Sequence, residues 1–427
     1  MEKKELELYL HIPFCVRKCA YCDFLSAPAD EKTRREYVYT LIQEIQGYKE
    51  AFYGQYHVSS VFIGGGTPSI LEADQMEKIF AALNQSFQIA EDAEITIEVN
   101  PGTASEEKLL AWKKVGINRL SIGLQSTDDR ELKMLGRIHT WQQFLETYRM
   151  AREQRFNNIN IDLISAIPGQ TVESWTRTLG QVAELNPEHI SAYSLIIEEG
   201  TPFFERYGEE EESQRLTCSE EDMEESGQQS VNAEQNGESS GDMSADKEQN
   251  VESLPPLPDE ETERTIYELT ADLLLQYGYE RYEISNYAKP GYACRHNIGY
   301  WERKEYLGIG LGASSLIGNT RFHNTADFKN YIEKVQGQKD IREEIEELSK
   351  AEEAEEFMFL GLRETKGISV QKFQDAFGKP IAEVYGKQIE KLCQEGLLES
   401  EGGYIRLTKH GIDVSNAVFV EFLEPEI

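Results

Sequence analysis

Three cysteines lie close together near the N-terminus, within HIPFCVRKCAYCDF at residues 11–24. Three residues separate Cys15 from Cys19, and two residues separate Cys19 from Cys22. Thiolates at such short spacings are typical ligands of zinc and of iron–sulfur clusters. The stretch therefore predicts a metal site with three protein thiolates and no fourth.

Three kinds of site account for these cysteines in part. A structural zinc site needs a fourth ligand; His11 is one candidate, although a polar residue at a strand end is the simpler interpretation. A redox-active Cys-x-x-Cys pair uses two thiols and leaves Cys15 without a role. An iron–sulfur cluster held by three thiolates keeps one iron open to a small molecule. The spacing alone leaves the zinc and cluster interpretations both open.

The composition limits the partners and the location. The chain has 427 residues and a formal net charge of −34. Such a chain repels phosphate backbones, so nucleic acid is not an expected partner. The sequence has no apolar run long enough to span a bilayer and no apolar signal-peptide core at its start. We therefore expect a cytoplasmic protein without a transmembrane segment.

Much of the negative charge falls in one segment. Fifteen acidic and two basic residues lie between Tyr207 and Pro258. Residues 208–258 are rich in Glu, Ser, Gln and Asn and carry few large apolar side chains. Such a stretch buries too little apolar surface to offset its ordering entropy, so it predicts a disordered acidic insertion.

Short β-branched or aromatic stretches alternate with amphipathic helical patterns through the first half of the chain. The predicted strands cover residues 6–10, 59–63, 94–99, 118–124, 158–164 and 189–195. The predicted helices cover residues 32–53, 72–87, 105–115, 141–154 and 171–185. This alternation predicts an α/β fold with a parallel sheet and crossover helices. Six units in a row favour a barrel or partial barrel over an open sheet, although periodicity alone does not decide between them.

Polar or glycine residues follow the predicted strands at their C-terminal ends, where the active site of a β/α barrel lies. The cysteine loop follows the first strand, and GGGTPS (64–69) follows the second. Glu98 ends the third strand, Gln125 follows the fourth, and Asp162 lies in the fifth. Each residue alone would be an ordinary cap or loop residue, but together they predict a functional site at this edge.

The C-terminal part of the chain differs from the repeated units. Residues 259–340 hold a region rich in Tyr and Gly that includes RHNIGYW at 295–301. Residues 341–427 show three helical patterns and then two short strands around Gly402 and Gly403, which predicts a winged-helix-like α+β domain. The acidic charge argues against DNA binding by this domain.

Several of these stretches together resemble one known family. The cysteine spacing is similar to the signature of the radical S-adenosylmethionine (SAM) enzymes, and GGGTP at 64–68 is similar to their second-strand motif. IEVNPG, LSIGLQS and NIDLISAIPGQT resemble segments of the oxygen-independent coproporphyrinogen III oxidase-like group within that family. RHNIGYW is similar to the motif of its HemW-type haem-chaperone branch. The resemblance covers almost the whole chain outside the acidic insertion.

The resemblance implies a domain organisation. It implies a partial (β/α)6 radical SAM barrel in residues 1–207, interrupted after that by the acidic insertion at 208–258. Residues 259–340 would close the barrel and carry the haem-related motif. Residues 341–427 would form the winged-helix-like domain.

The resemblance also implies cofactors and the residues that bind them. Cys15, Cys19 and Cys22 would hold a [4Fe–4S] cluster whose open iron binds the amino and carboxylate groups of SAM. The residues expected to line the SAM site are Tyr9, Tyr21, Gly65, Gly66, Thr67, Glu98, Gln125, Arg137 and Asp162. His296 in RHNIGYW would be the haem-related residue; without the resemblance, a hydrogen-bonded core histidine is the simpler interpretation.

Two functions fit the resemblance. The first is a haem chaperone that binds haem and passes it to recipient haem proteins such as respiratory enzymes, and that could form a homodimer. The second is an oxygen-independent coproporphyrinogen III dehydrogenase, which decarboxylates porphyrinogen propionates by radical SAM chemistry. The enzyme branch typically carries a further cysteine where this chain has Phe24. That departure and RHNIGYW together favour the chaperone.

Overall fold

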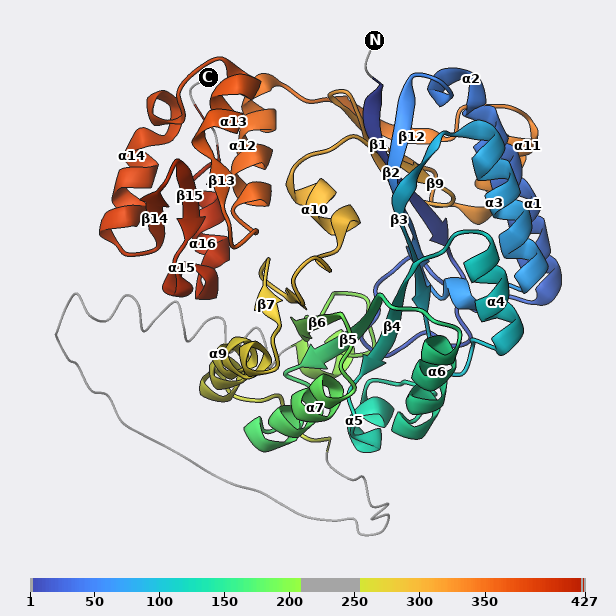
Figure 1. Cartoon of the computed structure of the whole chain (residues 1–427), viewed down its shortest axis with the longest axis horizontal. Coiled ribbons are helices and arrows are strands. Elements are labelled where there is room, and N and C mark those ends of the chain that lie inside the picture. Colours follow the sequence, from blue (N-terminus) through green and yellow to red (C-terminus); the bar gives the residue numbers. More distant parts are fainter. Residues whose placement is uncertain (1–2, 209–253, 424, 426–427) are drawn as a thin grey trace, which may run out of the picture.

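The computed structural model describes residues 3–208, 254–423 and 425 (Figure 1). The predicted disordered insertion falls mainly on residues 209–253, which lie outside the described residues. The first part of the chain and the region after the insertion build one large sheet, and the C-terminal part forms a smaller unit beside it (Figure 1).

Six parallel strands form the centre of the large sheet. They are β1 (Lys4–Ile12), β2 (Tyr56–Gly65), β3 (Ile89–Val99), β4 (Arg119–Gln125), β5 (Ile159–Ser165) and β6 (His189–Ser194). Each strand pairs in parallel with the next one along the chain. The α/β class predicted from the alternating pattern is confirmed, and the six strand ends meet at one edge of the sheet.

Helices lie on the outer side of these strands (Figure 1). They are α1 (Glu31–Gly47), α2 (Lys49–Phe52), α3 (Ala73–Ser86), α4 (Glu106–Lys114), α5 (Asp129–Met134), α6 (Trp141–Glu153), α7 (Val172–Glu184) and, after the insertion, α9 (Glu260–Gln276). The helix predicted over 32–53 is in fact two helices, which meet at Tyr48. The sequence pattern does not predict α5, because six residues are too few to show a helical period.

The parallel strands are buried on both faces, as expected for a sheet that helices cover. On β1, Leu6, Leu8 and Leu10 are completely buried in the main hydrophobic core. The alternate residues Glu7 and Tyr9 point to the opposite face of the sheet, because side chains alternate along a strand. This alternation carries polar side chains to the inner face, where the candidate site lies.

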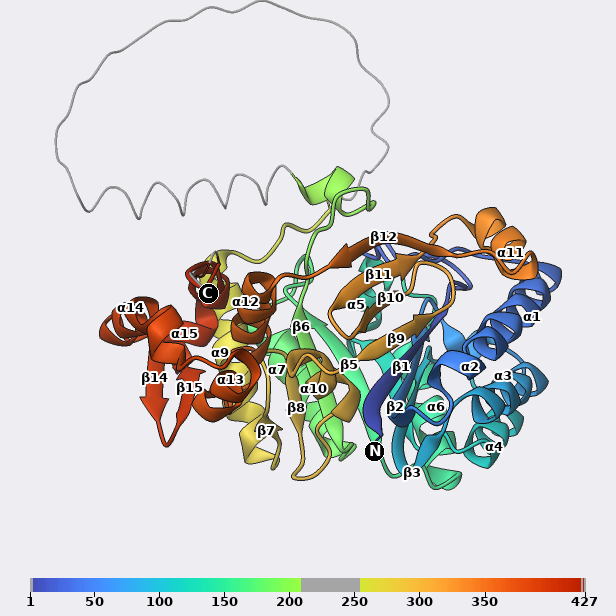
Figure 2. The same cartoon turned by 90° about the horizontal axis from the view of Figure 1, so that it is seen from above.

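The sheet extends beyond the six predicted strands at both edges (Figure 2). On the β1 side it continues through β9 (Tyr306–Ile309), β10 (Ser314–Ile317), β11 (Thr320–Asn324) and β12 (Arg342–Glu347). On the β6 side it continues through β8 (Asn286–Ala288) and β7 (Glu280–Arg281). Helix α11 (Phe328–Gln336) packs beside α1. The region after the insertion therefore completes both edges of the sheet.

The C-terminal unit has its own hydrophobic core. Its elements are α12 (Lys350–Gly361), β13 (Ile368–Ser369), α13 (Val370–Phe377), α14 (Ile381–Gln394), β14 (Leu398–Glu401), β15 (Tyr404–Leu407), α15 (Lys409–Asp413) and α16 (Ser415–Val420). The predicted hairpin turns at Gly402 and Gly403, both with positive φ. Three helices followed by a small antiparallel sheet give the winged-helix-like arrangement that the sequence predicts.

Helix α10 (Arg295–Trp301), which carries RHNIGYW, lies between the strands and the C-terminal unit (Figure 1). It contacts both β2 and α12. No helix within the described residues has the length and apolar character that a bilayer span requires.

Candidate functional site

The three cysteines lie in the loop between β1 and α1, at the edge where the parallel strands end. A bridge between Phe14 and Ala27 closes the base of this loop. The middle of the loop is fixed at Ala20, whose N–H donates to the Leu135 carbonyl and whose carbonyl accepts from the Phe203 N–H. The loop is therefore held by backbone bonds to two other elements of the barrel.

The thiols of this loop differ in exposure. Cys15 is buried, whereas Cys19 and Cys22 are partly exposed. Burial raises the pKa of Cys15 and of Cys22, so a positive charge is needed to hold them as thiolates. Arg137 brings one such charge to the loop, with Nη1 at 3.7 Å from the Cys19 Sγ.

These donors fit a cluster with several irons. In the described residues, no three or more His, Cys, Asp or Glu side chains lie close enough together to hold a single metal ion. In a cubane cluster each thiolate binds a different iron, so the three sulfurs do not have to meet at one point. Three thiols on one short loop beside a guanidinium group supply a suitable donor set.

His11 takes part in the end of β1 rather than in the cysteine loop. Its Nδ1 lies 3.0 Å from the Tyr9 hydroxyl, and its Nε2 lies 2.8 Å from the Leu25 carbonyl. Both ring nitrogens thus have hydrogen-bond partners, and burial lowers the pKa of His11. This geometry agrees with the strand-end role of His11.

The glycine turn after β2 lies directly against the end of β1. A Cβ on Gly66 would lie 2.5 Å from the Phe14 carbonyl oxygen, and a Cβ on Gly65 would lie 2.6 Å from the His11 ring. Gly65 also has a φ of +111°, in the region that favours glycine. The turn packs more closely than any side chain would allow, and the Gly66 N–H fixes it to β1 by donating to the Ile12 carbonyl at 2.9 Å.

Two partly buried carboxyl groups lie at this edge of the sheet. Glu98 Oε2 accepts a hydrogen bond from the Gly65 N–H at 3.1 Å. Asp162 accepts hydrogen bonds from the Ser121 hydroxyl at 3.0 Å and from Asn160 Nδ2 at 2.7 Å. Burial and the neighbouring Asp162 raise the pKa of Glu98 to about 8. A cationic ligand would stabilise both ionised carboxylates, and SAM carries such a charge on its sulfonium.

Asn100 joins several of the predicted residues, although the sequence indicates only that it follows a strand. Its Nδ2 donates to the Thr67 hydroxyl at 2.7 Å, and its Oδ1 accepts from Arg137 Nη2 at 2.7 Å. Arg137 Nη2 also donates to the Gly123 carbonyl at 2.7 Å. Gln125 ends β4 with a φ of +75°, so its side chain leaves the regular strand direction. Asn100 therefore links the glycine turn to Arg137 and the cysteine loop.

The two predicted tyrosines have different neighbours at this edge. Tyr9 is on the inner face of β1, bonded to His11. Tyr21 packs against a small apolar cluster that includes Leu135 and Phe203, and burial raises the pKa of Tyr21. The structure thus gathers the predicted SAM residues around the ends of β1 to β5.

His296 lies apart from this group, inside the barrel at the first turn of α10. The His296 Nδ1 is 2.8 Å from the Ser60 hydroxyl, and its Nε2 is 3.0 Å from the Tyr300 hydroxyl. The side chain is almost completely buried. Burial lowers the pKa of His296 to about 3, so the ring is neutral. His296 is thus a hydrogen-bonded core histidine with both nitrogens engaged.

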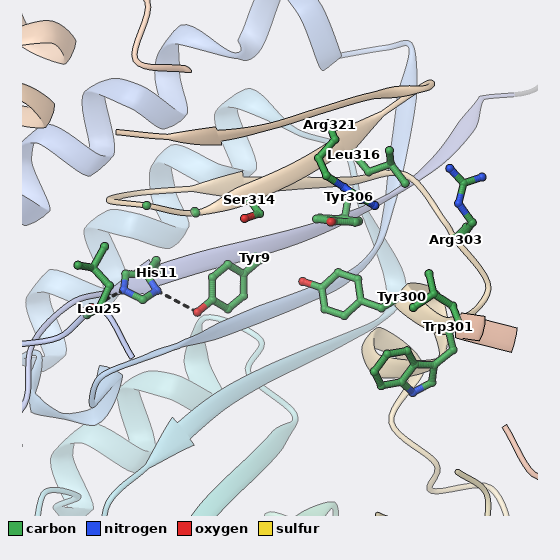
Figure 3. Close-up of a pocket in the computed structure, with 13 residues that line it drawn as sticks. Tyr9, His11, Leu25, Tyr300, Trp301, Arg303, Tyr306, Ser314, Leu316 and Arg321 are labelled. Atoms are coloured by element: carbon green, nitrogen blue, oxygen red, sulfur yellow. Dashed lines mark hydrogen bonds between the residues drawn. The ribbon is translucent and has the colours of Figure 1, made fainter. Parts of the chain in front are cut away.

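Tyr300, four residues later in RHNIGYW, faces a cavity of about 540 Å³ (Figure 3). Tyr9, Trp301 and Tyr306 line the same cavity, whereas His296 does not. The motif therefore reaches this cavity through Tyr300 and Trp301, with His296 behind Tyr300.

Similarity to known proteins shows the general class of this protein. The sequence matches the Radical SAM superfamily over residues 9–182 and the HemN C-terminal domain over residues 348–414. The structure resembles coproporphyrinogen III oxidase (HemN) from Escherichia coli, with a TM-score of 0.78 and 24% sequence identity over 99% of this chain and 91% of that chain. At this identity the likeness establishes the fold, which is that of a radical SAM protein with a HemN-type C-terminal domain.

Sequence relatives narrow this class. The chain is 34% identical to the heme chaperone HemW of Lactococcus lactis, over 100% of both chains. It is 33% identical to HemW of Bacillus subtilis, over 97% of this chain and 98% of the relative, and 32% identical to HemW of Escherichia coli, over 98% of each. The chain belongs to the HemW family of radical SAM proteins, and the predicted family is confirmed.

Proposed function

We propose that this protein is a haem chaperone, which binds haem and delivers it to recipient haem proteins in the cytoplasm. Respiratory haem enzymes are the expected class of recipient. The observation that carries this proposal is the position of RHNIGYW: α10 presents Tyr300 and Trp301 to a cavity large enough for a macrocycle. Full-length relatives named heme chaperone HemW support the same function.

The chaperone would also carry a [4Fe–4S] cluster and SAM. Cys15, Cys19 and Cys22 would hold the cluster, which supplies an open iron for SAM and a route for electrons. The turn from Gly65 to Thr67 would lie along the methionyl end of SAM, because glycines without side chains allow close approach of a ligand. Glu98, Gln125, Arg137 and Asp162 would line the rest of the site, together with Tyr9 and Tyr21.

Within RHNIGYW, the group offered to haem iron is the Tyr300 hydroxyl, and His296 acts through it. A tyrosine oxygen is a known axial ligand of haem iron. His296 Nε2 lies 3.0 Å from that oxygen and would hold it in position by this hydrogen bond, while the Ser60 hydroxyl holds the other ring nitrogen. His296 is then a positioning residue, which keeps a haem-related role without touching the iron.

Haem titration of the purified protein tests this proposal. Wild-type protein should bind haem, and Tyr300→Phe should weaken binding by about tenfold or more and remove the phenolate–iron charge-transfer band. His296→Ala should weaken binding and shift that band without abolishing it. Tyr277→Phe, at the end of α9, is the matched control and should bind as wild type does.

Absence of haem binding by the wild type would overturn the chaperone proposal. Wild-type binding with an unchanged spectrum in Tyr300→Phe would show that the iron donor lies elsewhere.

A further inference from the structure

The cavity beside RHNIGYW lies between the barrel and the C-terminal unit. It is bounded by β1, the β9–β11 extension of the sheet, α10 and α12 (Figure 3). Among the residues proposed for SAM, only Tyr9 lines this cavity. The cavity is thus a separate compartment that meets the SAM site at β1.

The charge of this cavity is opposite to that of the chain. The chain carries a net charge of −34, yet the described residues lining the cavity include Arg303 and Arg321 and no Asp or Glu. Glu356 of α12 bridges the two arginines: Oε2 lies 2.7 Å from Arg303 Nε and Oε1 lies 2.7 Å from Arg321 Nη1. One carboxylate between two guanidinium groups leaves an excess positive charge, which favours an anionic ligand.

Arg303 has unused hydrogen-bonding capacity. Its side chain is 14% exposed, and its Nη2 is buried with no hydrogen-bond partner among the described residues. Buried donors are rarely left without an acceptor, so a ligand acceptor is the simplest partner for this group. Guanidinium forks suit carboxylates because they can donate two parallel hydrogen bonds.

Arg303 lies in the turn that ends helix α10. Helix α10 ends with the Arg303 N–H donating to the Tyr300 carbonyl and the Lys304 N–H donating to the Gly299 carbonyl. In this type of helix end the residue at position 303 adopts a left-handed conformation, and glycine is the usual choice. Arg303 adopts it with a φ of +53°. Arg155 and Gln338 end helices in the same conformation, and glycine fits such a position without strain.

Aromatic side chains form part of the remaining wall, together with aliphatic and small residues. Tyr300 and Tyr306 meet edge to face with ring centroids 4.7 Å apart, and Trp301 and Tyr9 line the same cavity (Figure 3). Aromatic side chains with a pair of cations at one end match a planar, apolar ligand that carries carboxylates at its edge.

We propose that this cavity is the haem pocket and that Arg303 and Arg321 bind a haem propionate carboxylate. This inference rests on the proposed haem chaperone function and adds the chemistry by which the ligand is recognised. Glu356 fixes the Nε side of Arg303, so that Nη2 is the group left for the propionate. The sequence gives no sign of this pair, because Arg321 comes close to Arg303 only when strands β9 to β11 fold back on one another.

Titrations of the full-length protein with haemin and with haemin dimethyl ester test the inference. The ester keeps the macrocycle and the iron but removes the propionate charges. Wild-type protein should bind haemin roughly 10- to 100-fold more tightly than the ester. Arg303→Gly and Arg321→Gln should each weaken haemin binding but leave the affinity for the ester nearly unchanged. The ratio of the two affinities should therefore be smaller in each variant than in the wild type. Arg303→Gly also relieves the left-handed backbone, so the variant should fold.

Arg295→Gln is the matched control, since Arg295 lies on α10 and does not line the cavity. This variant should prefer haemin over the ester by the same factor as the wild type. The inference would be overturned if the wild type bound haemin and the ester equally well. It would also be overturned if both arginine variants kept the wild-type preference for haemin. In either case haem binding itself would still support the chaperone proposal. Failure of the wild type to bind either compound would overturn both proposals.

Discussion

At the scale of single residues, Glu98 has surroundings that favour the binding of a cation. Its side chain is partly buried, accepts one hydrogen bond from Gly65 and lies near the carboxyl group of Asp162. These surroundings raise the pKa of Glu98 to about 8, so the group is largely protonated at neutral pH without a cation beside it. The sulfonium of SAM would favour the ionised form.

The affinity for SAM should therefore increase with pH. Ionisation of Glu98 is needed for a favourable charge interaction, so SAM binding should strengthen as the pH rises toward about 8 and should level off above that pH. Glu98→Gln should bind SAM about tenfold or more weakly and should show a shallower pH dependence. Anaerobic calorimetry on protein with the cluster assembled measures both effects. Equal affinities and slopes in the two proteins would remove Glu98 from the SAM site.

At the scale of secondary-structure elements, the close contact between the end of β1 and the turn after β2 organises the site. Gly66 lies against the Phe14 carbonyl, and Phe14 is also part of the bridge that closes the cysteine loop. The contact therefore fixes the position of the glycine turn relative to the cysteine loop. A substitution in the turn should also shift the cysteines.

Gly66→Ala tests this contact. Its Cβ would lie 2.5 Å from a backbone oxygen, so the end of β1 must move. We expect a loss of roughly 1–3 kcal/mol in the free energy of unfolding of the cluster-free protein, together with weaker SAM binding. Gly47→Ala is the control, since a Cβ there meets nothing within 4 Å. Urea unfolding measures the free energy of unfolding of both variants. Equal values would mean that the end of β1 can move to accommodate the added Cβ at little cost.

The elements also show how far the sequence alone could predict the fold and the site. The six central strands are long enough for a β-branched or aromatic pattern to predict each of them. The edge strands, such as β7 (Glu280–Arg281), are too short to show any period. Their pairing depends on contacts across the sheet, so the sequence did not predict the cavity that β9 to β11 help to form. The contact of His296 with Ser60 was hidden for the same reason, because Ser60 approaches it from β2.

At the scale of the whole molecule, α10 connects the two units through charged contacts at its end. Glu302 pairs with Lys372 at 2.9 Å and with Lys366 at 3.1 Å, and both lysines belong to the C-terminal unit. Next to it, Arg303 pairs with Glu356 of α12. The proposed haem pocket is therefore built from the barrel and the C-terminal unit together, and a ligand in it touches both.

The acidic insertion should be dispensable for these sites. The described residues on its two sides meet, because the Tyr207 hydroxyl donates to the Pro255 carbonyl at 3.1 Å and the Gly169 N–H donates to the Pro256 carbonyl at 2.8 Å. A short Gly-Ser linker can therefore replace residues 209–253. The shortened protein should keep its iron content and its haem affinity, measured on the same preparation. Loss of either would give the insertion a role in cofactor assembly.

The central claim is that this radical SAM protein carries haem and does not decarboxylate coproporphyrinogen III. The most direct measurement is an anaerobic assay of full-length protein reconstituted with cluster and SAM, with E. coli coproporphyrinogen III oxidase (HemN) as the positive control. Porphyrinogen conversion and haem transfer to an apo-haem protein are followed on one sample. We predict haem binding and transfer with no conversion above background. Conversion of coproporphyrinogen III at a rate comparable to that of the control, without haem transfer, would contradict the account.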